Sequence, residues 1–200
     1  MANLKPELVF TPEIHKYFGA DQVVIVKVAQ KSQPIRRWYK QWTVTGDQNP
    51  AQIGDIYEEL MQQTKTALNG RAMKSVTLIW MQGERDAKES LSGHYEEAFL
   101  GLLTQIKTDL AAPKIHYIIG RLSDSGLGSK EWDNIRAIQQ KLGEAGPHSA
   151  WINTDDLNDE GTPSGKNDLH YSKKGYDMLA ERYAHKVKEL LSAAHSAAQK

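Results

Sequence analysis

The chain has 200 residues, of which 40% are hydrophobic and 25% are charged. This length suits one full domain and is too short for two cores joined by a linker, so we expect a single domain over residues 1–200. Lys plus Arg and Asp plus Glu both count 25, and the zero net charge excludes a strong overall attraction to nucleic acid or to an anionic membrane. The absence of cysteine excludes disulfides, thiol nucleophiles and thiolate metal sites.

Targeting and metal-binding signals are absent from the sequence. No stretch approaches the ~18 consecutive apolar residues of a membrane-spanning helix. The first residues, MANLKPELVF, lack the apolar core of a signal peptide, which leaves the compartment undetermined. The acidic run at 155–160 does not have the spacing of an EF-hand loop, so we interpret it as a solvated loop and expect no metal or cofactor.

Short apolar runs alternate with segments of helical periodicity. The runs that we interpret as strands are 23–26, 75–80, 115–119 and 149–152. Apolar residues recur at steps of three and four in the helical segments, which are 56–68, 95–110, 132–142 and 176–190. Strands this apolar have no face toward water, which is typical of a parallel sheet covered by helices on both sides. We therefore predict an α/β fold, a three-layer α/β/α sandwich, with its ligand site beyond the carboxyl ends of the strands.

The loop after the first predicted strand is rich in cations and aromatic residues. Residues 27–40 contain five Lys or Arg and two aromatic side chains. One interpretation is a recognition loop for a polar or anionic ligand, in which Arg36 or Arg37 donates hydrogen bonds and Trp38 or Tyr39 provides a stacking surface. The alternative is a solvated basic loop whose Trp38 packs at the edge of the core.

The loop after the second predicted strand carries several polar side chains within a few residues. It reads Trp80-Met-Gln-Gly-Glu-Arg-Asp-Ala87. A Gln82 amide suits donation to a developing oxyanion, and Glu84 suits orientation of a neighbouring group. A plain strand-end turn, with Asp86 near a helix start, explains the same residues.

Two further loops supply candidate residues. Residues 120–128 lack the glycine spacing of a phosphate-binding loop, so we expect a surface loop with Ser123 and Asp124 in the wall of a site. His170 precedes the last predicted helix and follows Asp168 by two residues. Histidine titrates near neutral pH and a carboxylate fixes its tautomer, so the pair suits a general base; the alternative is a surface or capping histidine.

Taken in chain order, these segments resemble the SGNH-type carbohydrate esterases, the group of sialic-acid 9-O-acetylesterases and family 6 acetylxylan esterases. The segment at 80–87 is similar to their W-x-Q-G-E-x-D-A block. Further similarity, covering roughly the whole chain, lies in Lys5-Pro-Glu-Leu-Val-Phe10, in 27–38, in Gly120-Arg-Leu-Ser-Asp124 and in Leu169-His-Tyr-Ser172. The resemblance implies a flavodoxin-like fold and a Ser/His/Asp esterase that removes acetyl groups from sugars.

The resemblance also implies roles for individual residues. His170 matches the general base, and Gln82 matches the side-chain donor of the oxyanion hole. Glu84 and Asp86 match supporting positions of the same block. Ser32 occupies a glycine position whose amide is a further oxyanion donor, and a positive φ at a serine costs energy.

The chain departs from the family pattern at the nucleophile and at the aspartate. The family's serine lies in a G-Q-S-N block after a central strand, and this block has no counterpart in the chain. The position three before the base is Asn167, while Asp168 lies two before it. An Asn keeps the geometry without the charge, a change that costs on the order of 10⁴ in the rate of a serine protease. Which of the two supports His170 stays open.

Three hypotheses follow. The first is an esterase acting on O-acetylated carbohydrate, with His170 as base and Ser32 as a stand-in nucleophile. The second is a non-catalytic sugar-binding relative whose ligand contacts are Arg36, Arg37, Trp38 and Gln82. The third is a shortened esterase whose lost central strand would leave two open strand edges and a slot. Either residues 1–18 refill this slot, or the chain is less stable and prone to associate. The expected partner is an acetylated carbohydrate, and the oligomeric state is not predicted.

Overall fold

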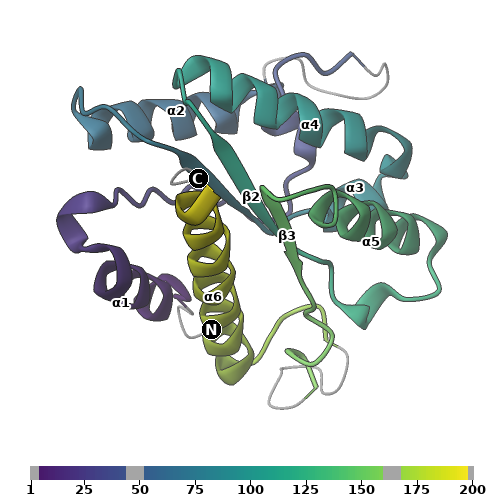
Figure 1. The fold of residues 1–200 in the computed structure, drawn as a ribbon. Coiled ribbons are helices and arrows are strands. Elements are labelled where there is room, and N and C mark those ends of the chain that lie inside the picture. Colours follow the sequence, from purple (N-terminus) through teal and green to yellow (C-terminus); the bar gives the residue numbers. More distant parts are fainter. Residues whose placement is uncertain (1–4, 44–51, 160–167, 198–200) are drawn as a thin grey trace.

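A three-stranded parallel sheet forms the centre of the molecule (Figure 1). The structure is a computed structural model and describes residues 5–43, 52–159 and 168–197. The strands are β1 (Val76–Trp80), β2 (Ile115–Gly120) and β3 (Ser149–Ile152), arranged in the order β1-β2-β3. The register pairs Val76 with Ile115 and Tyr117 with Ser149. Three of the four predicted strands are therefore confirmed.

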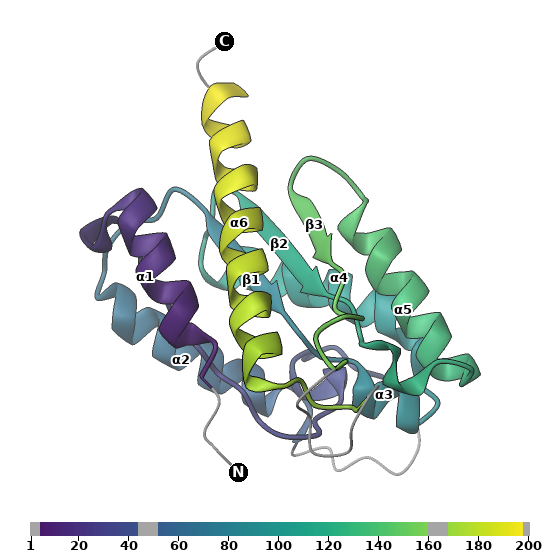
Figure 2. The ribbon, with the colours of Figure 1, turned by 90° about the horizontal axis from the view of Figure 1, so that it is seen from below.

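Helices cover both faces of this sheet (Figures 1 and 2). In chain order they are α1 (Glu7–Phe18), α2 (Asp55–Leu68), α3 (Glu84–Lys88), α4 (Ser92–Asp109), α5 (Lys130–Gly143) and α6 (Lys173–Ala197). One face carries α6, with α1 packed against it, and the other carries α2, α4 and α5. The predicted three-layer α/β fold and its four long helices are confirmed. No described helix is long and apolar enough to cross a membrane.

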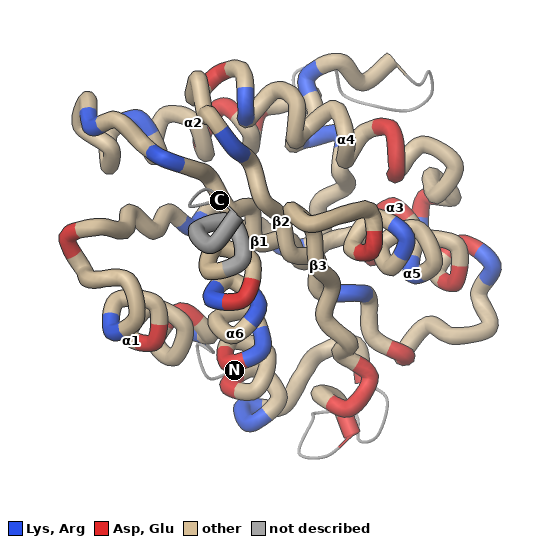
Figure 3. Tube along the Cα trace, viewed as in Figure 1, with Lys and Arg blue, Asp and Glu red and all other residues tan. Residues whose placement is uncertain are grey.

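Two apolar clusters fill the spaces between the layers because successive strand residues point to opposite faces. Tyr117 and Ile119 of β2 join the cluster beneath α4, whereas Ile118 joins the cluster beneath α6. The face of α4 that lies on the sheet carries apolar residues at steps of four, three and four, namely Tyr95, Phe99, Leu102 and Ile106, and all are buried. Charged residues lie outside these clusters, and Figure 3 shows both signs interspersed along the helices.

The first predicted strand, 23–26, is wrong. Residues 23–28 belong to no helix or strand, and no backbone hydrogen bond joins 23–33 to another described segment. The expectation that every strand is buried on both faces also fails at β1, where Ile79 is 36% exposed. A β-branched run favours extended backbone, but a strand needs a neighbouring edge to bond to. The outer edge of β1 and residues 23–28 both lack such a neighbour among the described residues.

The slot expected from the lost central strand is not refilled by the start of the chain. Residues 7–18 form α1, which packs against α6 through the buried Ile14. Residues 1–4 lie outside the described residues.

Gly175, near the start of α6, permits a close approach of the loop that follows β3. A Cβ at this position would lie 2.1 Å from the carbonyl oxygen of Leu157, a backbone atom that cannot rotate away. We expect Gly175→Ala to lower the free energy of unfolding by about 2 kcal/mol, measured by urea denaturation. Gly93 of α4 is the control, because a Cβ there meets nothing within 4 Å and alanine favours the helix. Equal urea midpoints for Gly175→Ala and Gly93→Ala would contradict this packing.

Candidate functional site

The carboxyl ends of the three strands meet at one edge of the sheet, and the loops that leave this edge carry the predicted site residues. Gln82 and Glu84 follow β1, Arg121 and Ser123 follow β2, and Asn153 follows β3. His170 lies in the segment that leads into α6 and is close enough to Glu84 to affect its titration. Ligands of open parallel sheets bind at this edge.

His170 is paired with Asp168 and not with any other described carboxylate. The imidazole Nδ1 lies 3.4 Å from Oδ1 of Asp168, and the same oxygen accepts the backbone N–H of His170 at 2.8 Å. Asp168 is buried, and its carbonyl accepts a hydrogen bond from Asn158 at 2.6 Å. The imidazole itself is 65% exposed. A fixed carboxylate thus faces one ring nitrogen while the ring stays accessible, and Asn167 lies outside the described residues.

Glu84 opens the short helix α3 directly after Gly83, whose φ of 143° favours glycine. Burial raises the pKa of the Glu84 carboxyl, and hydrogen bonds from the backbone of residues 83 and 84 and the charge of His170 act in the opposite direction. A carboxyl group that holds its proton unusually well therefore lies near the imidazole.

Gln82, the predicted oxyanion donor, is engaged within the fold. Its Nε2 donates to the carbonyl of Gln33 at 2.9 Å and to the carboxylate of Asp86. Asp86 also accepts the backbone N–H of Ile35, at 3.1 Å to each oxygen. The Oε1 of Gln82 is buried and has no hydrogen-bond partner. One amide hydrogen thus ties the end of β1 directly to the loop at 33–35, and the other ties it there through Asp86. The hydrogen on Gln33 must leave that carbonyl before Gln82 can bind an oxyanion.

Ser32 has a strained backbone. Its φ of 53° lies in the left-handed region, which costs on the order of 1 kcal/mol for a serine. A glycine, the residue that the esterase sequences carry at this position, adopts such a φ without this cost. The residue is exposed and precedes Gln33, which binds Gln82. In the described part of the chain, no serine hydroxyl forms a hydrogen bond with His170.

The basic loop at 27–40 is held by ion pairs and by the core. Arg36 pairs with Glu89, and Arg37 pairs with Asp55, with its Nε 2.8 Å from Oδ1. Trp38 is 7% exposed and packs edge-to-face against Trp80, with ring centroids 5.4 Å apart. The structure therefore favours the interpretation of Trp38 as a core residue, and it places both arginines on carboxylates of the fold.

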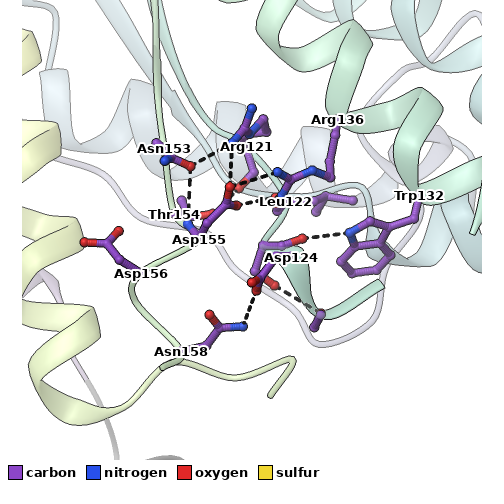
Figure 4. A network of polar contacts seen from close by, with 12 residues as sticks. Arg121, Leu122, Asp124, Trp132, Arg136, Asn153, Thr154, Asp155, Asp156 and Asn158 are labelled. Carbon is purple, nitrogen blue, oxygen red and sulfur yellow. Dashed lines mark hydrogen bonds and ion pairs between the residues drawn. The ribbon is translucent and has the colours of Figure 1, made fainter. Parts of the chain in front are cut away.

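The acidic run is not a solvated loop at Asp155, and sequence reasoning missed the network that this residue forms (Figure 4). Asp155 accepts from Arg121 at 2.8 Å and from both terminal nitrogens of Arg136 at 2.8 and 3.0 Å. Arg121 also lies over the ring of Trp151, 4.7 Å from its centroid. The three charged residues are far apart in the sequence, so spacing carries no signal for them. In the described ranges, no three His, Asp or Glu side chains are placed to hold a metal ion.

The loop at 120–128 is more buried than its composition suggests. Leu122 and Ser123 are both buried, so the prediction of a surface loop is wrong for these two residues. Asp124 accepts a hydrogen bond from Asn158 at 3.1 Å, and Asn158 in turn donates to the carbonyl of Asp168. Asp124 is therefore linked by two hydrogen bonds, through Asn158, to Asp168 in the segment that carries His170.

Comparison with known proteins shows the family of the chain. The sequence matches the family model described as SASA, carbohydrate esterase, sialic acid-specific acetylesterase, over residues 1–189. The chain belongs to this family. No curated protein matches the sequence. The X-ray structure of the Arabidopsis thaliana protein AT4G34215 is similar, with a TM-score of 0.69 and 20% identity over 94% of this chain and 68% of that chain, a likeness that shows the fold.

Within this acetylesterase-family chain, Asp86 offers a titration that stability measurements can follow. Burial raises the pKa of the Asp86 carboxyl to about 7 from 3.8. Between about pH 4 and pH 7 the folded state therefore binds more protons than the unfolded state, and the free energy of unfolding falls as the pH rises. We expect Asp86→Asn to remove this part of the pH dependence, measured by urea denaturation at pH 5 and pH 8.

The exposed Asp159 provides the matched control. Asp159→Asn should leave the difference between pH 5 and pH 8 as it is in the parent. If Asp86→Asn and the parent lose the same stability between these pH values, Asp86 does not titrate in this range.

Proposed function

We propose that the protein hydrolyses O-acetyl esters on carbohydrate, with His170 as the general base and Asp168 as the residue that orients it. The observation that carries this proposal is the exposed imidazole at the carboxyl edge, with a buried carboxylate 3.4 Å from its Nδ1. Membership of the acetylesterase family supplies the substrate class.

In this mechanism a hydroxyl oxygen attacks the acetyl carbonyl carbon while His170 takes the hydroxyl proton. Asp168 stabilises the imidazolium that results. The C–O bond to the sugar then breaks, and His170 returns the proton to the leaving sugar hydroxyl. Attack of water on the acetyl intermediate, by the same proton transfers, releases acetate.

The oxyanion would be held by the amide of Ser32 and by Gln82. For this purpose Gln82 exchanges its hydrogen bond with the Gln33 carbonyl for one with the substrate. The nucleophile is not identified in the chain, and Ser32 is the first serine to test because it adjoins the residue that binds Gln82.

Labelling with a fluorophosphonate tests the proposal, because such probes react with an activated serine whatever the substrate. We expect one adduct by intact mass, and none in the His170→Ala variant. Peptide mapping names the serine, and Ser32→Ala shows whether Ser32 is that residue. Absence of an adduct on protein shown to be folded by circular dichroism would overturn a serine-esterase mechanism for this chain.

A second function, sugar binding without turnover, is favoured by one observation on the described residues. No serine hydroxyl forms a hydrogen bond with His170. Titration calorimetry with an O-acetylated sugar separates the two functions. A binding protein would keep its affinity in His170→Ala and would release no acetate.

A further inference from the structure

The segment that carries the candidate general base is held by the turn that follows β3. Residues 168–172 belong to no helix or strand, so contacts with other segments determine where this part of the chain lies. The side chain of Asn158, in the turn, donates to the carbonyl of Asp168 at 2.6 Å. The carbonyl of Leu157, beside it, accepts the backbone N–H of Ser172 at 3.4 Å. The shorter of these two bonds is made to the residue whose carboxylate faces the imidazole.

The turn is itself anchored to the sheet and to the core. Leu157 is 1% exposed and belongs to the apolar cluster beneath α6. Its N–H bonds to the carbonyl of Thr154 at 3.1 Å, and the hydroxyl of Thr154 donates to the carbonyl of Arg121, after β2, at 2.6 Å. Asn158 follows Leu157 and is fully buried as well. The loops after two strands thus fix the place of the Asn158 side chain.

The two partners of Asn158 determine which way its amide group points (Figure 4). Its Nδ2 donates to Oδ1 of Asp124 at 3.1 Å and to the carbonyl of Asp168 at 2.6 Å. A carboxylate and a carbonyl only accept hydrogen bonds, so the nitrogen has to face them, and a rotated amide would bring oxygen against oxygen. The Oδ1 of Asn158 is buried and has no hydrogen-bond partner in the described part of the chain. Because an unsatisfied buried acceptor costs free energy, the side chain is placed for its two donations.

We propose that Asn158 is the positioning residue of the pair formed by Asp168 and His170, and that it acts through the Asp168 carbonyl. Holding this carbonyl fixes the backbone from which the carboxylate projects. Oδ1 of Asp168 lies 3.4 Å from Nδ1 of His170 and accepts the backbone N–H of His170 at 2.8 Å, so a shift of the Asp168 backbone changes both contacts. The inference rests on the proposed function, in which His170 is the general base, and Asn158 itself touches no reacting atom.

The consequence for His170 is a choice between two neutral tautomers. A carboxylate beside Nδ1 favours the form with the proton on Nδ1, and this form leaves the lone pair of Nε2 free to take a proton from a hydroxyl. Without the carboxylate the proton moves to Nε2, the nitrogen that carries it more often in histidine in water. A residue that only stabilises the fold would leave the tautomer as it is. The tautomer of His170 therefore separates positioning by Asn158 from a purely structural role.

Long-range proton–nitrogen correlation spectra of isotope-labelled protein report which ring nitrogen carries the proton. At about pH 8.5, where histidine is ordinarily neutral, we expect His170 of the parent to carry its proton mainly on Nδ1. In Asn158→Ala the ratio of the Nδ1–H to the Nε2–H form should fall by at least about threefold, the size of effect that the loss of one hydrogen bond has. Asp168→Ala gives the ratio without the carboxylate, and His170→Ala assigns the signals. His185 is the internal reference, because its Nε2 pairs with Glu189 at 2.9 Å and its tautomer should stay unchanged.

Two further variants separate positioning from stability. Gln105→Leu is the matched control, because Gln105 is also a buried amide with two hydrogen bonds to backbone groups, and it lies on α4, on the other face of the sheet. It should lower the urea midpoint and leave the His170 tautomer unchanged. The double variant Asp124→Asn/Asn158→Asp restores a hydrogen bond between positions 124 and 158, with donor and acceptor exchanged, but leaves the Asp168 carbonyl without its donor. We expect it to keep the altered tautomer ratio.

Three results would overturn the role of Asn158: a parent His170 with its proton mainly on Nε2, a parent ratio in folded Asn158→Ala, or an equal change in Gln105→Leu. A parent ratio in the double variant would overturn the action through the Asp168 carbonyl. The spectra do not depend on turnover, so the two proposals fail separately. A changed tautomer without a fluorophosphonate adduct would keep the positioning and remove the serine-esterase reaction, whereas an adduct with an unchanged tautomer would do the reverse. Where turnover is measured, Asn158→Ala should lower kcat by about tenfold and leave KM within about twofold.

Discussion

Replacing His170 with alanine is expected to lower the rate of acetyl-ester hydrolysis by about 10²–10⁴-fold, the usual contribution of a positioned general base. The expectation follows from the geometry, because Oδ1 of Asp168 lies 3.4 Å from Nδ1 of His170 and the imidazole is 65% exposed. Acetate release from O-acetylated sialic acid and from acetylated xylan measures it, with kcat and KM determined separately.

The His170→Ala variant also distinguishes a loss of catalysis from a loss of folding. His170 is mostly exposed, so His170→Ala should unfold at the same urea concentration as the parent. His185 is the matched control, since it is an exposed histidine of α6 that pairs with Glu189, and His185→Ala should keep the parent's rate. A parent rate retained in His170→Ala would show that the base lies elsewhere. A parent that binds acetylated sugar and releases no acetate would select the binding function.

The parts of the fold that were predictable from sequence are those that local pattern determines. The runs that became β1 and β2 are mostly apolar and rich in β-branched residues, and the run that became β3 contains Trp151 and Ile152. Each is followed along the chain by a helix whose apolar residues recur at steps of three and four. Helix α1 carries little of this signal, because it contains Pro12 and buries only Ile14. Its position depends on α6, which lies more than 150 residues away in the sequence.

Residues 23–26 show the limit of local pattern. They are as apolar as the true strands, and Val23 packs against the apolar cluster beneath α6. Whether such a run becomes a strand depends on a neighbouring edge, and the segment bonds to none in the described structure. The sequence of the run contains no information about that edge.

The features of the site also divide into those that local sequence predicts and those that depend on the assembled fold. The Gln82, Asp86 and His170 positions were recognisable because the residues occur in blocks with fixed spacing. The hydrogen bonds from Gln82 to Gln33 and Asp86 depend on how two loops meet, which spacing does not reveal. The pairing of Asp155 with two arginines from other loops is likewise a product of the assembled sheet edge.

The pairing of Asp155 with the two arginines gives the second prediction of a large effect, a loss of stability in Asp155→Ala. Removing the Asp155 carboxylate in Asp155→Ala leaves the guanidinium groups of Arg121 and Arg136, whose side chains are only 13% and 10% exposed, without their shared counter-charge. Burial, together with the nearby Arg136, already lowers the pKa of Arg121, so the environment disfavours a second unpaired charge. We expect a loss of about 3 kcal/mol in the free energy of unfolding, or about 6–12 °C in Tm by calorimetry.

The neighbouring Asp156 provides the control for this prediction. It pairs with Arg182 at a more exposed position, with 48% of the carboxylate side chain accessible. Asp156→Ala should therefore cost less than about 1 kcal/mol. Changing Arg136 to Leu in the Asp155→Ala background removes one of the two unpaired charges and should restore part of the lost stability. Equal losses for Asp155→Ala and Asp156→Ala would mean that solvent screens both carboxylates alike, and that the network stabilises the site edge no more than a surface ion pair does.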